Sequence, residues 1–133
     1  MSMLRFGCAV ASAAVVFMAV PASTQRVAPG LVLDRLETGL WELRSSSGAG
    51  LGSICLGDRL RLAQPQHRDT DCAREVIASD SRSATVHYGC PGIGRGRTTI
   101  RLETPRLVQI DSQGIDRGAP FALRAEARRT GAC

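Results

Sequence analysis

The sequence predicts a small all-β protein: an antiparallel meander of about six strands forming a curved sheet, with one or two short helices and two disulfides. Three observations lead to this prediction. Short runs of alternating apolar and polar residues recur at the spacing of hairpins. Cys72 and Cys90 flank a segment that can fold back on itself in register. Four cysteines remain after an N-terminal export signal is removed, and this even number suits disulfides in an exported chain.

Residues 1–22 have the features of a secretory signal peptide. Arg5 supplies a positive charge, residues 9–20 form an uncharged apolar run, and small residues precede a cleavage point before Ser23. The run is too short for a transmembrane helix, and no later segment is long enough to span a bilayer. Cys8 is expected to be removed with the signal, and a retained N-terminal anchor is the alternative.

Residues 23–38 are expected to form a leader. Residues 23–29 are polar and contain proline, which is typical of a mobile start. Residues 31–38 have apolar side chains at helical spacing and stop at Gly39, but their alternation also suits an extended arm. The leader is therefore predicted to be partly helical at most.

Residues 39–133 are predicted to form one disulfide-braced β domain. Its first strand covers residues 39–44, in which Trp41 and Leu43 point to one face. A Ser/Gly turn or loop over residues 45–52 leads to a second short strand, residues 53–56.

A short helical turn is expected after the second strand. Asp58 can cap a turn over residues 59–64, which Pro65 ends. Residues 66–71 are then expected to form a polar loop.

Residues 72–90 predict a β-hairpin with residues 80–82 as a three-residue loop. This register puts the apolar residues and both sulfur atoms on one face, whereas a slip by one residue would separate them. The predicted pairs are Ser79–Ser83, Ala78–Ala84, Val76–Val86, Arg74–Tyr88 and Cys72–Cys90.

The C-terminal part predicts three more strands. After a glycine-rich connection, residues 98–103 and 107–111 form a hairpin in which Ile100 faces Ile110 and Leu102 faces Val108. Residues 113–120 are expected to form a Gly/Pro loop. The last strand, residues 121–128, alternates between the inward residues Phe121, Leu123, Ala125 and Ala127 and outward charged residues.

A Cys72–Cys90 bridge across the hairpin would leave Cys55 to pair with Cys133. Four cysteines allow three pairings, so the sequence alone does not decide between them. A zinc site is the other common use of four cysteines, but none of them has the close paired spacing of such sites.

All 17 basic residues are arginines, and the formal net charge is +5. An anion-binding surface and a simple bias toward arginine both account for this composition. Arg95, Arg97 and Arg101 form the densest basic run, and Arg97 and Arg101 are expected on one side of a strand, where they could bind an acidic partner or remain solvated. Nucleic-acid binding is not expected, because aromatic residues for base stacking are scarce.

Several of these features together resemble the domain-of-unknown-function 3617 family, a group of small exported bacterial proteins with four cysteines. The likeness covers about residues 39–133. It implies a periplasmic location and supports the two disulfides, but the family has no established catalytic residues to carry over. The features are Gly39-Leu40-Trp41-Glu42, Cys55-Leu56 before a short capped helix, the cysteine-flanked hairpin, a glycine-rich step into Thr98-Thr99-Ile100 and the terminal Gly131-Ala132-Cys133.

No catalytic, cofactor-binding or metal-binding residue is predicted. His87 is expected on the outward face in an ion pair with Glu75, and a surface metal site with His67, Asp69 and Asp71 is the weaker alternative. A serine hydrolase is disfavoured because the chain has no G-x-S-x-G motif. Residues 92–96 superficially resemble a phosphate loop, but they lead into a strand and not a helix.

The expected function is non-enzymatic binding in the periplasm or outside the cell. The concave face of the sheet would hold a small apolar ligand or meet an envelope protein, with Trp41 either lining that site or belonging to the core. The alternative is an inhibitor of an envelope hydrolase, a protease or a lysozyme, that inserts a rigid loop, residues 91–96 or 113–120.

Overall fold

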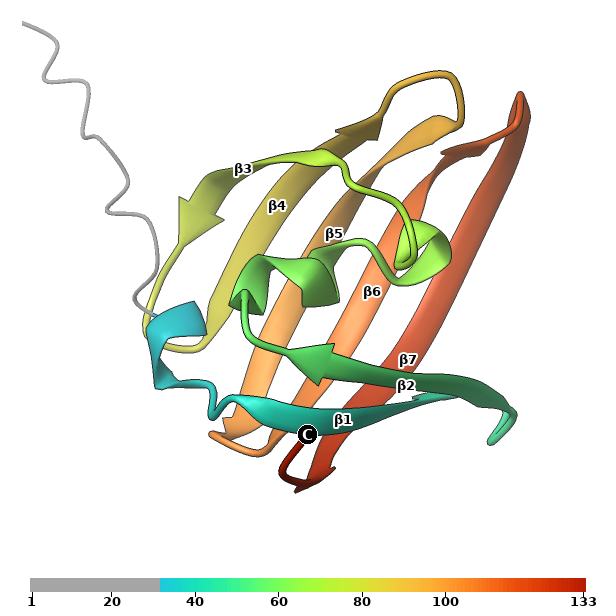
Figure 1. Cartoon of the computed structure of the whole chain (residues 1–133). Helices are drawn as coiled ribbons and strands as arrows, with labels where there is room; N and C mark the ends of the chain where they lie inside the picture. Colours follow the sequence, from blue (N-terminus) through green and yellow to red (C-terminus); the bar gives the residue numbers. More distant parts are fainter. Residues whose placement is uncertain (1–31) are drawn as a thin grey trace, which may run out of the picture.

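The computed structural model describes residues 32–133, and the predicted signal peptide and most of the leader lie outside this range. Seven antiparallel strands form one open sheet in the order β2-β1-β7-β6-β5-β4-β3 (Figure 1). The predicted all-β class and the antiparallel meander are confirmed, with one strand more than expected. Strands β2 and β3 form the two edges of the sheet.

The N-terminal part forms a short helical turn and a hairpin. Turn η1 (Leu33–Arg35) precedes strands β1 (Gly39–Ser45) and β2 (Gly50–Leu56). Trp41 and Leu43 of β1 are buried, as predicted from their alternation. Strand β2 begins earlier than expected, because residues 50–52 pair with the end of β1.

Two single turns of 3-10 helix cross the concave side of the sheet: η2 (Arg59–Ala63) and η3 (Pro65–His67) (Figure 1). The predicted cap of η2 is confirmed, since Asp58 Oδ1 accepts a hydrogen bond from the Leu60 amide at 3.0 Å. Turn η3 was predicted as loop. The fully buried Gln64 joins the two turns, because its amide nitrogen donates to the carbonyl oxygens of His67 and Thr70 at 2.7 and 2.6 Å.

The hairpin of β3 (Ala73–Ser79) and β4 (Ser83–Cys90) has the predicted register only near its cysteines. The pairs Arg74–Tyr88 and Val76–Val86 are confirmed. A bulge at Ile77 then shifts the register, so Ala78 faces Thr85 and Ser79 faces Ala84. The predicted Ala78–Ala84 and Ser79–Ser83 pairs are therefore wrong.

Strands β5 (Gly94–Thr104), β6 (Leu107–Asp116) and β7 (Ala119–Gly131) are much longer than predicted. The Ile100–Ile110 and Leu102–Val108 pairs are confirmed. The expected loop over residues 113–120 is wrong, because β6 and β7 pair up to a tight turn at Arg117-Gly118, where φ is 47° and 82°. The second half of the expected connection over residues 91–96 is likewise the start of β5.

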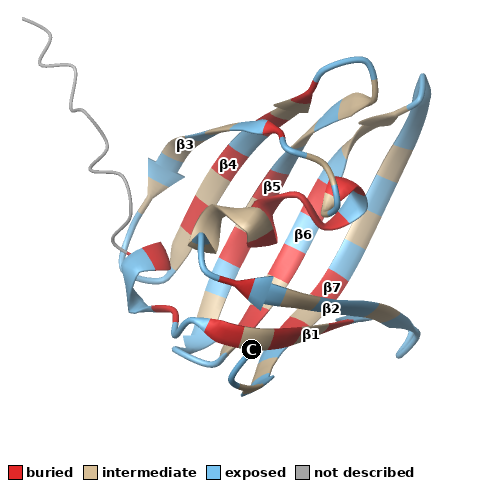
Figure 2. Ribbon diagram, viewed as in Figure 1, coloured by how far each residue is buried: buried red, intermediate tan, exposed pale blue. Residues whose placement is uncertain are grey.

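The core lies on the concave face of the sheet, beneath η2 and η3 (Figure 2). Trp41, Leu62 and Ala63 belong to one buried cluster with the inward residues of β4 to β7. The concave face is therefore filled by the protein's own side chains. Trp41 is a core residue and does not line a cavity for a small apolar ligand on this face.

Each edge strand is held by a disulfide. Cys55 in edge strand β2 is bonded to Cys133, just after β7, and the strand between them is β1. Cys72, directly before edge strand β3, is bonded to Cys90 at the end of β4. These are the two pairs expected from the sequence. Two disulfides are typical of proteins that fold in an oxidising compartment. Within residues 32–133, the helical turns are all far too short to cross a membrane.

Reduction of the disulfides is expected to lower the free energy of unfolding substantially. On the chain-entropy account, the bridge across 18 residues contributes about 3 kcal/mol and the bridge across 78 residues roughly 4 to 5 kcal/mol. Urea unfolding followed by Trp41 fluorescence, with and without a reductant, measures the effect. An unchanged unfolding midpoint after complete reduction would show that the edges are held by other contacts.

Candidate functional site

A group of interacting polar side chains under the sheet surrounds His67, which was predicted on a polar loop. The structure instead buries it, with 5% of its surface exposed. Its Nδ1 lies 3.1 Å from the Tyr88 hydroxyl and its Nε2 lies 3.3 Å from Asp116 Oδ1. The amide of Gln66 donates to the other carboxylate oxygen of Asp116 at 3.2 Å. We call His67, Tyr88, Asp116 and Gln66 the latch, because they join η3 to the sheet.

Glycines make room for the rings of the latch. Tyr88 lies over Gly96 on the neighbouring strand, where a Cβ atom would come within 2.6 Å of the phenol ring. His67 lies over Gly94, where a Cβ atom would come within 2.9 Å of Nε2. Phe121 closes the cluster on the β7 side, with its ring centroid 5.9 Å from that of His67. The glycines that suggested a loop in the sequence thus mark a place where rings lie directly on a strand.

The electrostatics of the latch favour a structural role. The pKa of Tyr88 is raised to about 12, chiefly by burial; the hydroxyl of Ser112 acts against this rise and the carboxylate of Asp116 adds to it. The amide of Gln66 holds the pKa of Asp116 below its ordinary value, with Arg117 and His67 adding to the effect. A phenol so reluctant to ionise, with 3% of its surface exposed, is a poor base or nucleophile at neutral pH. The latch therefore anchors η3.

The second histidine, His87, lies on the exposed outer face directly opposite Glu75, as predicted. The expected ion pair is wrong, because the ion pairs of residues 32–133 include none between these two side chains. The alternative metal site with His67, Asp69 and Asp71 does not assemble either, since His67 turns inward. Across the described residues, no three His, Cys, Asp or Glu side chains are grouped so as to hold a metal ion.

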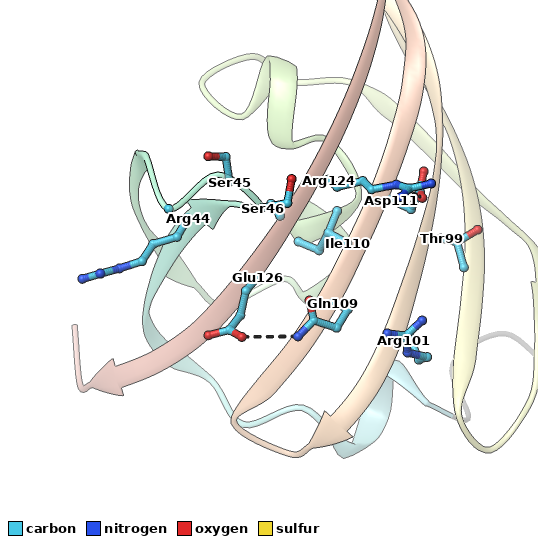
Figure 3. Close-up of a pocket in the computed structure, with 12 residues that line it drawn as sticks. Arg44, Ser45, Ser46, Thr99, Arg101, Gln109, Ile110, Asp111, Arg124 and Glu126 are labelled. Carbon is cyan, nitrogen blue, oxygen red and sulfur yellow. Dashed lines mark hydrogen bonds and ion pairs between the residues drawn. The ribbon is translucent and has the colours of Figure 1, made fainter.

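The outer face of the sheet carries a hollow of about 640 Å³ between the strands β5 to β7 and the β1–β2 turn (Figure 3). Its arginines have carboxylate partners. Arg124 Nε lies 3.1 Å from Asp111, and Arg44 lies 2.9 Å from Glu42. Gln109 and Glu126 point toward each other and form a hydrogen bond at 3.3 Å (Figure 3). We call this the balanced hollow, because its charges largely neutralise one another.

A second hollow of about 560 Å³ lies on the same face, nearer to the β4–β5 and β6–β7 turns. The strand register explains its shape. Its floor is the backbone row Tyr88–Gly96–Gly114–Phe121; one wall is the row His87–Arg97–Gln113, and the other is the row Arg95–Ile115–Pro120.

This second hollow has no carboxylate in its lining. Within residues 32–133, neither Arg95 nor Arg97 has a hydrogen bond or ion pair from its side chain, whereas Arg101 lies 3.7 Å from Glu103. We call it the cationic hollow. The sequence singled out its two arginines as part of the densest basic run, but it gave no sign that they lie beside Ile115 and Pro120.

The two segments expected to be inserting loops contribute only short turns, which lie side by side. The Arg117 amide donates to the Ile93 carbonyl oxygen at 2.8 Å and so joins the β6–β7 turn to the β4–β5 turn. Residues 92–96 enter strand β5 without a helix, so they lack the helix N-terminus on which phosphate loops depend.

The pKa of Tyr88 can be tested directly, because the chain contains a single tyrosine. Its phenolate absorbance should appear with a midpoint near pH 12 in the folded protein and near the ordinary value of 10 in denaturant. Because folding raises this pKa, its contribution to stability is intact below pH 10 and is lost as the pH rises toward 12. A folded-state midpoint near 10 would contradict the burial of the hydroxyl.

Glycine substitutions are expected to affect stability differently on the concave and the outer face of the sheet. Gly96→Ala is expected to lower the free energy of unfolding by about 1–3 kcal/mol, because the Tyr88 ring must move. Gly89→Ala is the matched control, since a Cβ atom on Gly89 meets nothing within 4 Å, and it should leave stability nearly unchanged. Thermal unfolding of both variants measures the difference, and equal effects would contradict the packing of Tyr88 on Gly96.

Comparison with models of protein families, with characterised proteins and with solved structures finds no match to this chain. Function therefore has to be inferred from the side chains themselves. The rings of His67 and Tyr88 in the latch are buried, and the balanced hollow is internally paired. Of the latch and the two hollows, the cationic hollow is the one whose charged groups face solvent without partners, and it is the candidate site.

Proposed function

We propose that this chain is an exported, non-enzymatic binding protein of the periplasm or extracellular space, and that it binds a small ligand on the outer face of its sheet. One observation carries the proposal: the cationic hollow brings together two arginines that have no counterion. Such groups gain from an anionic ligand, because they need not first give up an internal partner.

Export is supported by two features of the chain. The first 22 residues have the pattern of a signal peptide, and both pairs of the remaining cysteines are disulfide-bonded. The resemblance to the domain-of-unknown-function 3617 family is consistent with a periplasmic protein.

The outer face is favoured over the concave face because of what fills each. The concave face is covered by η2 and its buried Leu62 and Ala63, so a ligand there would have to displace the core. A ligand in a hollow of the outer face would not have to displace any part of the core. A rigid, preformed site also binds with a smaller loss of conformational entropy, and the two disulfides provide that rigidity.

An inhibitor of an envelope protease or lysozyme is the second candidate. It is favoured by the two turns at residues 91–93 and 117–118, which are joined by the Arg117–Ile93 hydrogen bond and lie next to the Cys72–Cys90 disulfide. A rigid double tip of this kind suits insertion into an enzyme cleft. Inhibition assays against envelope proteases and lysozyme test this candidate, and the absence of any inhibition by the disulfide-intact protein would eliminate it.

Native mass spectrometry of the protein purified from its own envelope tests the binding proposal. The wild-type protein should carry a non-covalent adduct, and the double variant Arg95→Ala, Arg97→Ala should lose most of it. The matched control is Arg82→Ala, which removes another exposed arginine, from the β3–β4 turn at the opposite end of strand β4. Wild-type protein without any adduct, or equal loss in the control, would contradict the proposal.

A further inference from the structure

We infer that the cationic hollow binds an amphiphilic anion: one molecule with a phosphate or carboxylate head on an alkyl chain. This inference rests on the proposed function and specifies its ligand class. The observation behind it is that two arginines without ion-pair partners lie beside a track of apolar side chains. Neither feature alone would define such a ligand.

The head group would be held by Arg95 and Arg97. These arginines are two residues apart on β5, so both side chains leave the same outer face of the sheet. Strand pairing places His87 and Gln113 on either side of Arg97, which adds further polar groups around the same point. Guanidinium groups present paired donors that match the oxygens of a phosphate or carboxylate.

The nearest carboxylates do not neutralise these arginines. Asp111 lies two residues beyond Gln113 on β6 and is paired with Arg124. Asp116 faces the concave side, where it contacts His67 and Gln66. Glu75 faces His87 from the edge strand and forms no ion pair with either arginine. The positive charge of the hollow therefore remains available to a ligand.

The alkyl chain would follow Ile115 toward the β4–β5 turn. Ile115 and Pro120 form the wall that faces the arginines. A neighbouring hollow of about 570 Å³ shares Arg95 and Ile115 with the cationic hollow and continues to Pro91 and Ile93. Arg95 is its one charged lining residue, and the rest of its lining consists of apolar side chains and glycine backbone. Alkyl groups gain free energy when such a surface is removed from water.

Gly89 keeps this track open. It faces Arg95 across the β4–β5 pair, and a Cβ atom at this position would meet nothing within 4 Å. A side chain here would occupy the space beside Arg95 without disturbing the core. The same glycine therefore provides a way to block the site while leaving the fold intact.

One bound molecule is favoured over a membrane surface. The apolar residues line hollows between rows of side chains, whereas proteins that bind a bilayer surface present apolar side chains that project into it. The volume of each hollow suits a small ligand, since pockets for such molecules measure roughly 300–1,000 Å³.

Isothermal titration calorimetry with dodecyl phosphate, below its micelle concentration, tests the inference on the mature, disulfide-intact protein. Binding should be one to one, and laurate should also bind if the carboxylate head is accepted. Inorganic phosphate and dodecanol should each bind at least about tenfold more weakly, because each supplies only one half of the interaction. Equal binding by phosphate alone would overturn the amphiphile assignment.

Variants locate the binding site. Arg95→Ala and Arg97→Ala should each weaken dodecyl phosphate binding roughly tenfold or more. Gly89→Leu should do the same by filling the track. The matched controls are Arg82→Ala and Gly50→Leu; a Cβ atom on Gly50 also meets nothing within 4 Å, and Gly50 lies on edge strand β2, away from the hollow. Both controls should bind as the wild type does, and equal losses in them would overturn the location.

Two further outcomes separate the inference from the proposed function. If dodecyl phosphate and laurate fail to bind while envelope-purified protein carries an adduct that needs Arg95 and Arg97, the ligand class is wrong and the binding function stands. If neither binding nor an adduct is found, both are wrong. Binding to phosphatidylglycerol vesicles that is unaffected by Gly89→Leu would overturn the single-molecule site in favour of a membrane surface.

Discussion

An open sheet has two edge strands, and the fixing of both edges is the constraint on which this structure depends. The Cys55–Cys133 bond holds β2, and the Cys72–Cys90 bond holds β3. Arg74 adds to this on the β3 side, because its guanidinium bonds Gln64 at 2.6 Å and Asp58 at 3.0 Å. With its edges held, the sheet can stay curved around η2 and η3 although the chain provides few large aromatic residues for a core.

The row Tyr88–Gly96–Gly114–Phe121 links the two sides of the sheet. On the concave side, Gly96 lacks a side chain and lets the Tyr88 ring lie against the strand. On the outer side, the backbone of the same row is the floor of the cationic hollow. The latch thus makes this part of the sheet rigid from within, which is what a preformed binding site on its outer surface requires.

Local patterns predicted those features that depend on neighbouring residues in one hairpin. The Ile100–Ile110 and Leu102–Val108 pairs and the Asp58 cap were predicted because alternation and cap chemistry act over a few residues. The bulge at Ile77 was missed, because its sequence has no distinguishing residue. Strands β5 to β7 were predicted too short because glycine usually signals a turn. Here Gly94, Gly96 and Gly114 accommodate close contacts with neighbouring strands and, at Gly94, with His67 of η3, which alternation within one strand cannot reveal.

The candidate site shows that local sequence patterns also cannot predict which charged side chains are paired. Composition showed that every basic residue is an arginine but could not show which arginines lack a carboxylate. Strand register decides this: Arg124 lies opposite Asp111 across β6 and β7, whereas Arg97 lies between His87 and Gln113 and Arg95 between Gly89 and Ile115. One sheet face therefore carries a hollow whose charges are internally neutralised and another whose charges are not. Because an exposed ion pair contributes little stability, the unpaired arginines cost the fold little. They are also the groups with the most to gain from an anionic ligand.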